Sequence, residues 1–327
     1  MTKMTMVQAL NLALRQEMEK DDRVVLLGED IGLDGGVFRV TDGLIEHFGA
    51  DRVLDTPLAE AAIVGMAIGM GVYGLRPVCE IQFSGFAYQS FHQVENHAAR
   101  MRWRTQGRHH VPMVLRAPYG GGVRALEHHS ESREAFWAHI PGLKMVIPSG
   151  PRNARALLVS AIRDPDPVIF YEPKALYRAF REEVPEAEET LPLGRAQVVR
   201  EGADLTLIAY GAMVRPALAA ADMLLEKDGV AAEVIDLVTI SPLDEETFSA
   251  SVKKTGRAVI IHEAPRSFGP GAEILARLVD TVFYYLEAPV ARVAGFDVVI
   301  PLFSREKAYL PSAERIVYES RKVLAAV

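Results

Sequence analysis

The segment DTPLAE at residues 55–60, followed by the apolar, glycine-rich segment AAIVGMAIGMGVYGL at residues 61–75, is the most informative part of this chain. It places a carboxyl group, Glu60, at the start of a helix expected to be buried. Burying a carboxylate is costly unless it is paired, hydrogen-bonded or protonated, and a carboxyl group kept partly protonated in an apolar site suits proton transfer. The competing interpretation is that Glu60 simply begins the helix, where the helix dipole favours a negative charge.

Short apolar runs alternate with helical segments on both sides of this helix. The pattern predicts strands at 24–27, 77–82, 111–116, 143–147 and 168–171, and helices at 6–18, 59–73, 87–103 and 152–163. Thr5 is the expected N-cap of the first helix. Alternation of this kind is typical of a parallel sheet in an α/β protein.

An acidic, proline-containing segment at 181–195 interrupts the alternation and is predicted to be a linker. Beyond it, strands are predicted at 205–210, 232–236, 258–262 and 291–294, and helices at 214–227, 245–254, 272–278 and 313–324. The chain is therefore expected to form two α/β domains, 1–180 and 196–327. Each would be a mainly parallel sheet flanked by helices.

Composition excludes several classes of function. The formal net charge of −7 gives no reason to expect nucleic acid or an acidic membrane as a partner. The single cysteine, Cys79, excludes an internal disulfide framework and a cysteine-based metal or iron–sulfur site, and it suits a cytoplasmic protein. The sequence lacks the run of about 18 apolar residues that spans a bilayer.

Several side chains are candidates for chemistry, although the common nucleotide and zinc motifs are absent from the sequence. His129, in HHSES at 128–132, follows a glycine-rich loop at the end of a predicted buried strand, where parallel sheets carry functional groups. A surface role is the alternative. Phe86 lies at a strand–helix junction, where its ring could face a planar ligand. The turn DPDP at 164–167 could hold a hard cation, although most such turns are only turns.

Taken together, short motifs along essentially the whole chain resemble one family. They are GED at 28–30, GGVF at 35–38, DTPLAE at 55–60, EIQF at 80–83, HS at 129–130, PGLK at 141–144, EPKALYR at 172–178 and LEAP at 286–289. The chain resembles the beta subunit of the thiamin-diphosphate-dependent decarboxylating component of 2-oxoacid dehydrogenase complexes. The resemblance implies a pyrimidine-binding-type thiamin diphosphate domain, followed by a transketolase C-terminal-like domain for assembly and docking.

The resemblance also implies roles for individual residues. Glu60 corresponds to the glutamate that hydrogen-bonds the pyrimidine ring nitrogen of thiamin diphosphate and activates it by proton exchange. Phe86 would pack on the aminopyrimidine, and Leu58 and Gln82 would lie near it. His129 would assist transfer of the acyl group to the lipoyl arm. A structural potassium site is implied, mostly through backbone oxygens, at Met113, Ala161, Asp164 and Asp166.

One absence fits this assignment. Stand-alone thiamin enzymes carry a Gly-Asp-Gly segment that helps to hold magnesium and the diphosphate, and this sequence has none. The resemblance implies that an alpha subunit supplies the part of the cofactor site that binds magnesium and the diphosphate. The two subunits would form an α2β2 heterotetramer that acts with a lipoyl-bearing acyltransferase component. The chain is therefore expected to be inactive without the alpha subunit.

Different motifs in the sequence favour different 2-oxoacid substrates. HHS at 128–130 and EPK at 172–174 favour a branched-chain substrate, whereas EIQF at 80–83 also suits pyruvate enzymes. The preferred expectation is a branched-chain 2-oxoacid dehydrogenase, with pyruvate or acetoin dehydrogenase as alternatives. Three further alternatives are a transketolase-like fragment, a ferredoxin-linked 2-oxoacid oxidoreductase and a non-catalytic α/β assembly subunit.

Overall fold

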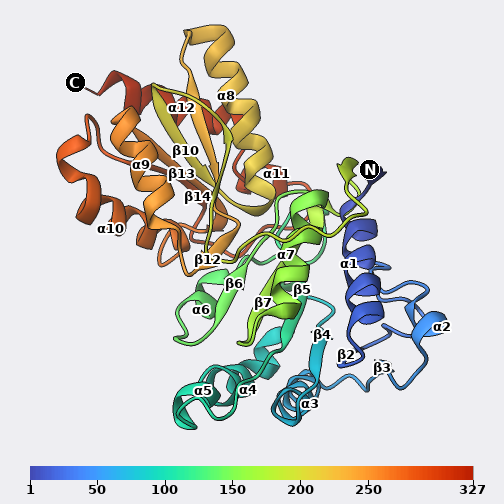
Figure 1. The fold of residues 1–327 in the computed structure, drawn as a ribbon. Coiled ribbons are helices and arrows are strands. Elements are labelled where there is room, and N and C mark those ends of the chain that lie inside the picture. The colour runs from blue at the N-terminus through green and yellow to red at the C-terminus, as the bar shows by residue number, and fades with distance from the viewer. Residues whose placement is uncertain (327) are drawn as a thin grey trace. The chain divides into compact units, whose positions relative to one another are not determined.

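The protein is described by a computed structural model over residues 1–326, which form two compact α/β units (Figure 1). The N-terminal unit contains Met1–Tyr119 and Phe136–Leu193. The C-terminal unit contains Gly120–Ala135 and the chain from Gly194 onward. The predicted fold class is confirmed. The domain boundaries 1–180 and 196–327 stay a prediction, and they did not anticipate that 120–135 (hereafter the excursion) belongs to the C-terminal unit.

The N-terminal unit is built on a parallel sheet in which the strands follow the order β6-β7-β5-β4-β2-β3. Their bounds are β2 Val24–Gly28, β3 Val53–Asp55, β4 Arg76–Glu80, β5 Val114–Tyr119, β6 Lys144–Val146 and β7 Val168–Pro173. Strands β2, β5 and β7 are buried at every residue, as expected for a parallel sheet covered on both faces.

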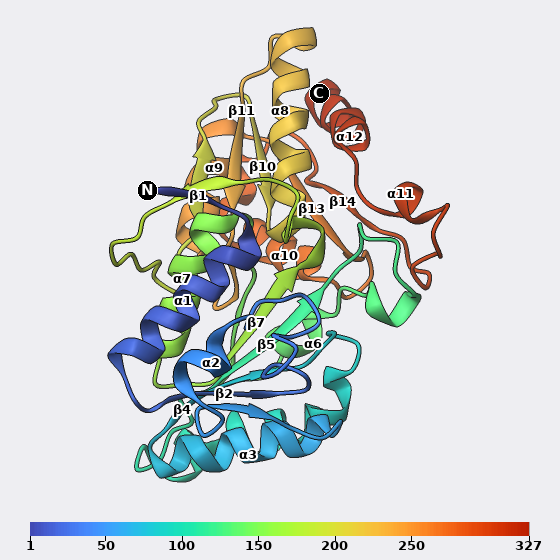
Figure 2. The ribbon, with the colours of Figure 1, turned by 90° about the vertical axis from the view of Figure 1, so that its right-hand side faces the viewer.

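Helices cover both faces of this sheet (Figure 2). Helices α1 (Met6–Lys20) and α7 (Pro151–Arg163) pack against each other on one face, and α3 (Glu60–Tyr73) lies on the other. Thr5 caps α1 as predicted, in a capping box with Gln8. Two short helices are α2 (Leu44–Phe48) and α6 (Glu134–Ala138), and α6 begins in the excursion.

The segment predicted to be helical at 87–103 is helical in the structure, but it is divided into short helices of different types. The structure has a 3-10 helix (Ala87–Ser90), α4 (Phe91–Gln93), a π-helix (Val94–Ala98) and α5 (Met101–Arg104). The buried Ser90 hydroxyl donates to the carbonyl oxygen of Ala87 at 2.7 Å. A serine side chain that bonds to nearby backbone competes with regular helical hydrogen bonds, which accounts for the break near Ser90.

The segment predicted to be a linker is ordered within the N-terminal unit. Strand β8 (Glu182–Val184) pairs antiparallel with β1 (Thr2–Met4). The acidic run also binds α7, because Arg152 Nη2 lies 2.6 Å from Glu189 Oε1. The acidic, proline-containing segment is therefore an ordered stretch packed on the N-terminal unit, not a flexible linker.

The C-terminal unit has a sheet with strand order β14-β13-β10-β11-β9. The strands are β9 Gln197–Arg200, β10 Leu205–Ala209, β11 Ala232–Asp236, β13 Ala258–Pro265 and β14 Ala291–Gly295. Strand β12 (Thr239–Ser241) lies in the same unit but is not part of this sheet. All neighbours in this sheet are parallel except β9, which pairs antiparallel with β11 at the edge. The sequence analysis missed β9.

Two helix pairs flank this second sheet (Figure 2). Helices α8 (Val214–Asp228) and α12 (Ala313–Ala325) pack together, as do α9 (Glu245–Thr255) and α10 (Pro270–Val282). A short helix, α11 (Glu306–Tyr309), precedes α12. Within residues 1–326, no helix combines the length and the apolar character needed to cross a membrane.

Candidate active site

The candidate site lies at the carboxyl edge of the N-terminal sheet. Gly28, the last residue of β2, is opposite Asp55 at the end of β3 and Glu80 at the end of β4. The segments that leave these three strands carry Glu29, Glu60 and the residues after Glu80. Ligands bind to open parallel sheets at this edge, so the architecture brings the predicted residues of 58–86 to one place.

Glu60 is the first residue of α3 and is 8% exposed. The residue before it, Ala59, offers no capping side chain, so a carboxylate in the first turn interacts favourably with the helix dipole. Glu29 directly follows β2 and is 4% exposed. Its carboxyl group is close enough to Glu60 to be affected by the charge of that residue. Burial raises the pKa of Glu29 to about 6, and the charges of Glu60 and Asp30 add to that rise. The site thus holds two buried carboxyl groups, and the negative charge of Glu60 favours the protonated form of Glu29.

Glu29 is a residue that the sequence analysis missed as a candidate. In the sequence, Glu29 stands out only as the middle residue of the motif GED at 28–30. A usable signal was present, because Glu29 follows a strand of five buried residues and so stands at the ligand-binding edge. Glu29 Oε1 and the Thr56 hydroxyl are buried and have no hydrogen-bond partner among residues 1–326. Orphaned polar atoms in such a place are the kind that a bound ligand satisfies.

Gln82 also belongs to this edge. Its Nε2 donates to Asp30 Oδ2 at 2.9 Å, which ties the segment after β4 to the segment after β2. Asp55 braces the same loop, because its carboxylate accepts hydrogen bonds from the backbone N–H groups of Gly32 at 2.6 Å and Leu33 at 3.2 Å. These contacts fix the loop that carries Glu29.

Aromatic rings lie beside these polar groups. The ring centroids of Phe83 and Phe86 are 5.8 Å apart in an edge-to-face arrangement, and Phe38 contacts Phe83 in the same way at 5.6 Å. Phe86 is only partly buried, so part of its ring is accessible to a ligand. Leu58, on the loop before α3, is 79% exposed and makes an apolar surface beside Glu60 in the chain.

A buried ionic network lies within the sheet next to this carboxyl edge. Arg116 on β5 donates to Glu80 Oε2 at 2.7 Å and to both oxygens of Glu172 on β7, at 2.6 and 3.0 Å. The Tyr177 hydroxyl donates to Glu172 Oε2 at 2.6 Å. Burial raises the pKa of Glu80, and the charge of Arg116 opposes that rise. The network joins three neighbouring strands just before the residues of the site, and the sequence analysis did not foresee it.

The residues at this edge fit the aminopyrimidine part of thiamin diphosphate. A buried carboxyl group can exchange a proton with a ring nitrogen, orphaned polar atoms can accept or donate hydrogen bonds, and a half-buried aromatic ring can stack. Glu60, Gln82 and Phe86 would provide these functions, with Glu29 as an additional carboxyl group. Their assignment to a cofactor remains a prediction.

His129 belongs to a different part of the architecture. It ends a 3-10 helix (Glu127–His129) within the excursion, which is part of the C-terminal unit. Its ring contacts that of His128, with centroids 4.5 Å apart. The adjacent Ser130 is buried, whereas His128 is exposed. His129 is thus placed on a compact turn and is half-buried.

The residues implied in a potassium site surround the turn between α7 and β7: Met113, Ala161, Asp164 and Asp166. Lys144 Nζ lies 2.6 Å from Asp164 Oδ1 and 3.7 Å from Asp166 Oδ2, and Arg102 Nε lies 2.5 Å from Asp166 Oδ1. Over residues 1–326, no group of three or more His, Cys, Asp or Glu side chains is arranged to hold a metal ion. Both aspartate side chains are already paired with Lys144 or Arg102, so a potassium ion would have to be bound by backbone oxygens. Binding of potassium stays a prediction.

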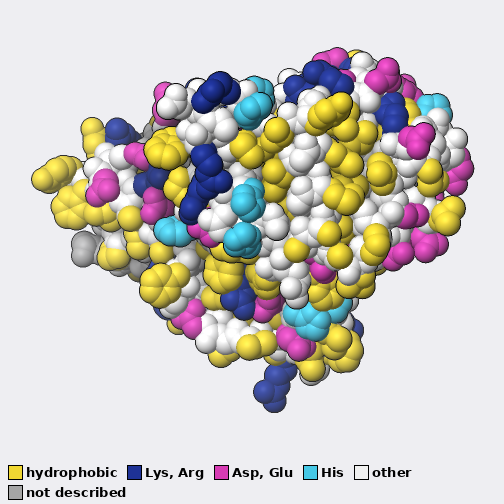
Figure 3. All heavy atoms as spheres, turned by 90° about the horizontal axis from the view of Figure 1, so that it is seen from below, with side chains coloured by type: hydrophobic (Ala, Val, Ile, Leu, Met, Phe, Trp, Pro, Cys, Tyr) yellow, Lys and Arg dark blue, Asp and Glu magenta, His cyan; other side chains and the backbone are white. Residues whose placement is uncertain are grey.

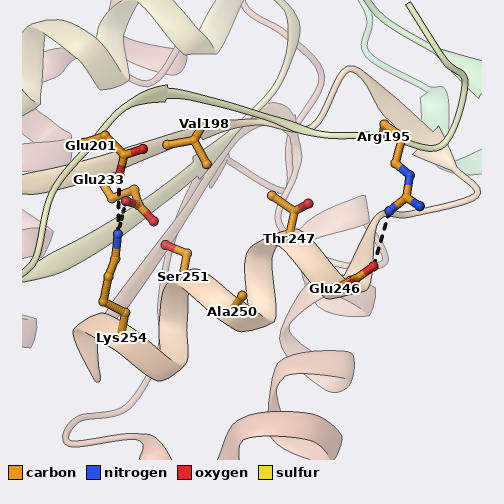
Figure 4. A pocket seen from close by; sticks show the side chains of 9 residues that line it. All are labelled: Arg195, Val198, Glu201, Glu233, Glu246, Thr247, Ala250, Ser251 and Lys254. Carbon is orange, nitrogen blue, oxygen red and sulfur yellow. Dashed lines mark hydrogen bonds and ion pairs between the residues drawn. The ribbon is translucent and has the colours of Figure 1, made fainter.

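The C-terminal unit also carries an open groove of about 650 Å³ between β9, β11 and α9 (Figure 4). It is lined by Arg195, Val198, Glu201, Glu233, Glu246, Thr247, Ala250, Ser251 and Lys254. Lys254 is bonded to Glu233, and Arg195 Nη1 lies 3.3 Å from Glu246 Oε2. Because these charges already neutralise each other, the groove resembles a solvated surface more than a reaction site.

Comparisons with known proteins place the chain in a family. Residues 2–179 match the family model "Transketolase, pyrimidine binding domain", and residues 194–316 match "Transketolase, C-terminal domain". A solved structure titled "Split gene transketolase, inactive beta4 tetramer" has a TM-score of 0.80 over 99% of both chains at 23% identity, which shows the shared fold.

Curated relatives are much more similar in sequence. The chain is 52% identical over 324 residues to "Pyruvate dehydrogenase E1 component subunit beta" of Bacillus subtilis, covering 99% of each chain. It is 50% identical over 322 residues to the protein of the same name from Acholeplasma laidlawii, covering 98% of each. Because both transketolase-type domains match in order and these relatives are about half identical over nearly the whole chain, the chain belongs to the family of E1 beta subunits of thiamin-diphosphate-dependent 2-oxoacid dehydrogenases.

Proposed function

We propose that this chain, together with an alpha subunit, decarboxylates pyruvate on thiamin diphosphate and transfers the acyl group to lipoyl-lysine of an acyltransferase component. The relatives at about 50% identity over the full length are named for pyruvate, not for a branched-chain 2-oxoacid. The branched-chain preference inferred from the sequence is therefore given up in favour of its alternative. The observation that carries the reaction class is the buried Glu60 and Glu29 pair at the carboxyl edge.

When bound, thiamin diphosphate supplies the nucleophilic carbon and the electron sink that decarboxylation of a 2-oxoacid requires. Glu60 would exchange a proton with the pyrimidine ring nitrogen. Glu29 has a raised pKa of about 6, so it holds a proton over the mildly acidic range beside Glu60. Phe86 and Gln82 would orient the ring. Magnesium and the diphosphate would be held mainly by the alpha subunit.

The surface of α3 supports assembly with other subunits. Helix α3 is apolar all round, yet Ala62, Met66, Gly69 and Tyr73 form an exposed stripe at helical spacing. Met66 is 42% and Tyr73 is 90% exposed. Figure 3 shows hydrophobic side chains gathered on the face that includes α3. Apolar patches of this kind mark protein interfaces, which is consistent with an α2β2 heterotetramer.

Reconstitution tests the proposal. The chain would be mixed with an alpha subunit, thiamin diphosphate and magnesium, and kcat/KM for pyruvate would be compared with that for 3-methyl-2-oxobutanoate. We expect activity only in the mixture, with pyruvate preferred by about tenfold or more, since a difference of a methylene or two in an apolar pocket gives discrimination of that order. Equal use of both substrates, or preference for the branched one, would contradict the assignment of pyruvate.

The role of Glu60 is tested separately in the same assay. Glu60→Gln keeps the size of the side chain and removes the exchangeable proton, so we expect activity to fall by about a hundredfold or more. Glu46→Gln, on the exposed surface of α2, is the matched control and should leave activity unchanged. Full activity in Glu60→Gln would show that the residue does not activate the cofactor, and would favour a non-catalytic role for the chain.

A further inference from the structure

The excursion Gly120–Ala135, which carries His129, is held by carboxylates of the C-terminal unit. Glu263 on β13 accepts a hydrogen bond from the backbone N–H of Gly121, with 2.8 Å between N and Oε2. Glu306, the first residue of α11, accepts from Gly122 N at 2.9 Å through Oε1 and from Arg124 N at 3.1 Å through Oε2. Both carboxylates are 3% exposed. Such charge-assisted hydrogen bonds are stronger than neutral ones.

The backbone of the excursion is shaped for these contacts. Gly120 and Gly122 have φ angles of +80° and +93°, which residues with a side chain rarely adopt. A Cβ atom on Gly120 would lie only 2.6 Å from Glu263 Oε1. Arg124 itself has a φ of 57°, an unfavourable conformation for a side chain of its size. The N–H groups of Gly121, Gly122 and Arg124 are close in sequence within this glycine-rich turn, and two different carboxylates accept from them. Backbone N–H groups gathered in a turn make a concavity that binds anionic oxygens.

The far end of the excursion is anchored as well. The backbone N–H of Gly120 donates to the carbonyl oxygen of Glu131 at 3.1 Å, which closes the loop around His129. Beyond this closure, the Tyr210 hydroxyl donates to Glu134 Oε1 at 2.6 Å in the core of the C-terminal unit. A cavity of only about 20 Å³ remains beside Ser130 and Glu263, which is space for about one water molecule.

We propose that Glu263 and Glu306 are positioning residues for His129, through which the C-terminal unit sets the geometry of acyl transfer. The inference rests on the proposed function and on the role in acyl transfer that the family resemblance implies for His129. It goes beyond the assembly and docking role expected for this unit. The two carboxylates hold the start of a closed loop of which His129 is part, so their loss displaces the imidazole without changing the carboxyl edge that carries Glu60. A misplacement of about 1 Å can lower a rate about a hundredfold.

The test uses the reconstituted heterotetramer and measures two half-reactions. Decarboxylation is followed with an artificial electron acceptor, and acyl transfer is followed on the lipoyl domain of the acyltransferase component. Glu306→Gln leaves only one acceptor oxygen for two N–H groups, so we expect acyl transfer to fall by about tenfold or more while decarboxylation changes less than about threefold. Glu263→Gln, which can still present one oxygen to Gly121, should lose less. Glu246→Gln, exposed in the same unit, is the charge-matched control.

Two further measurements separate this inference from the proposed function. Combining Glu306→Gln with His129→Ala should cost no more acyl transfer than His129→Ala alone, because the two substitutions act on one group. Hydrogen exchange at the amides of Gly121, Gly122 and Arg124 should become faster in Glu306→Gln, whatever His129 does. Unchanged exchange, additive losses, or equal losses in both half-reactions would overturn the positioning role. If His129→Ala alone leaves acyl transfer intact, the proposed role of His129 fails instead.

Discussion

Glu134 gives the clearest link between structure and pH-dependent stability. Its side chain is fully buried in the C-terminal unit, where the Tyr210 hydroxyl donates to one carboxyl oxygen. The other oxygen has no hydrogen-bond partner in the described chain, residues 1–326. Burial raises the pKa of Glu134 from 4.5 to about 7, the hydrogen bond from Tyr210 opposes the rise, and the charge of Glu263 adds to it. The folded protein therefore binds this proton more tightly than the unfolded chain.

The sign and size of the effect follow from linkage. Because the folded pKa lies above the unfolded one, this group's stabilising contribution is complete below about pH 4.5 and is lost as pH rises through about 7. At 1.36 kcal/mol per pKa unit, the rise from 4.5 to about 7 amounts to about 3 kcal/mol. Glu134→Gln keeps a neutral side chain at every pH, so it should not lose this contribution.

The assay is urea-induced unfolding of wild type and Glu134→Gln between pH 5 and 8. The difference between the two free energies of unfolding removes the titration of all other groups. We expect the variant to gain on wild type by about 2 to 3 kcal/mol as pH rises across this range. Glu287→Gln, half exposed in the same unit, should show a flat difference. A flat difference for Glu134→Gln as well would refute the argument, since it would mean that Glu134 is already ionised at pH 5.

Three other predictions concern single side chains. Arg116→Met should lower the free energy of unfolding of the N-terminal unit by about 3 to 5 kcal/mol, because it leaves Glu80 and Glu172 buried without their cation, and a denaturant titration would show it. Gly120→Ala should lower the thermal midpoint by several degrees through its positive φ and the clash with Glu263, whereas no change in midpoint would contradict that geometry. Burial lowers the pKa of His262 to about 4, so wild-type stability should fall as pH drops from about 6.5 to 4, and His262→Gln should remove that dependence in acid unfolding followed by circular dichroism.

Much of the fold could be predicted because the signals for it are local. The alternation of apolar runs and helical segments follows directly from burial of both faces of a parallel sheet, and the N-cap at Thr5 depends only on its neighbours. The edge strand β9 was not predicted, because it is partly exposed and its Val198 and Val199 do not belong to a buried apolar run. The interrupted helix at 87–104 escaped because a serine hydroxyl, not a glycine or a proline, competes with the helical hydrogen bonds.

The candidate site was predictable in part for a similar reason. Glu60 stands out because a charge adjoins an apolar run, and that contrast is visible in the sequence. The effect of Glu60 on the pKa of Glu29 depends on parallel pairing of β2 with β3, which brings together two residues 31 positions apart in the sequence. The contact of Glu263 with Gly121 joins residues 142 positions apart through a backbone N–H group. Such a contact has no periodicity, and its donor is a backbone N–H group that every residue except proline carries, so nothing in the sequence indicates it.

The excursion has a consequence for how this chain can be divided. The polypeptide passes from one unit to the other at Tyr119–Gly120, returns at Ala135–Phe136, and leaves again at Leu193–Gly194. A fragment ending near residue 193 would therefore keep the glycine turn but lose Glu263 and Glu306, and a fragment starting near residue 194 would keep both carboxylates without the amides they bind. The two halves recognised by separate family models are thus not interchangeable modules, and grafting either one onto another protein must carry this loop's contacts with it.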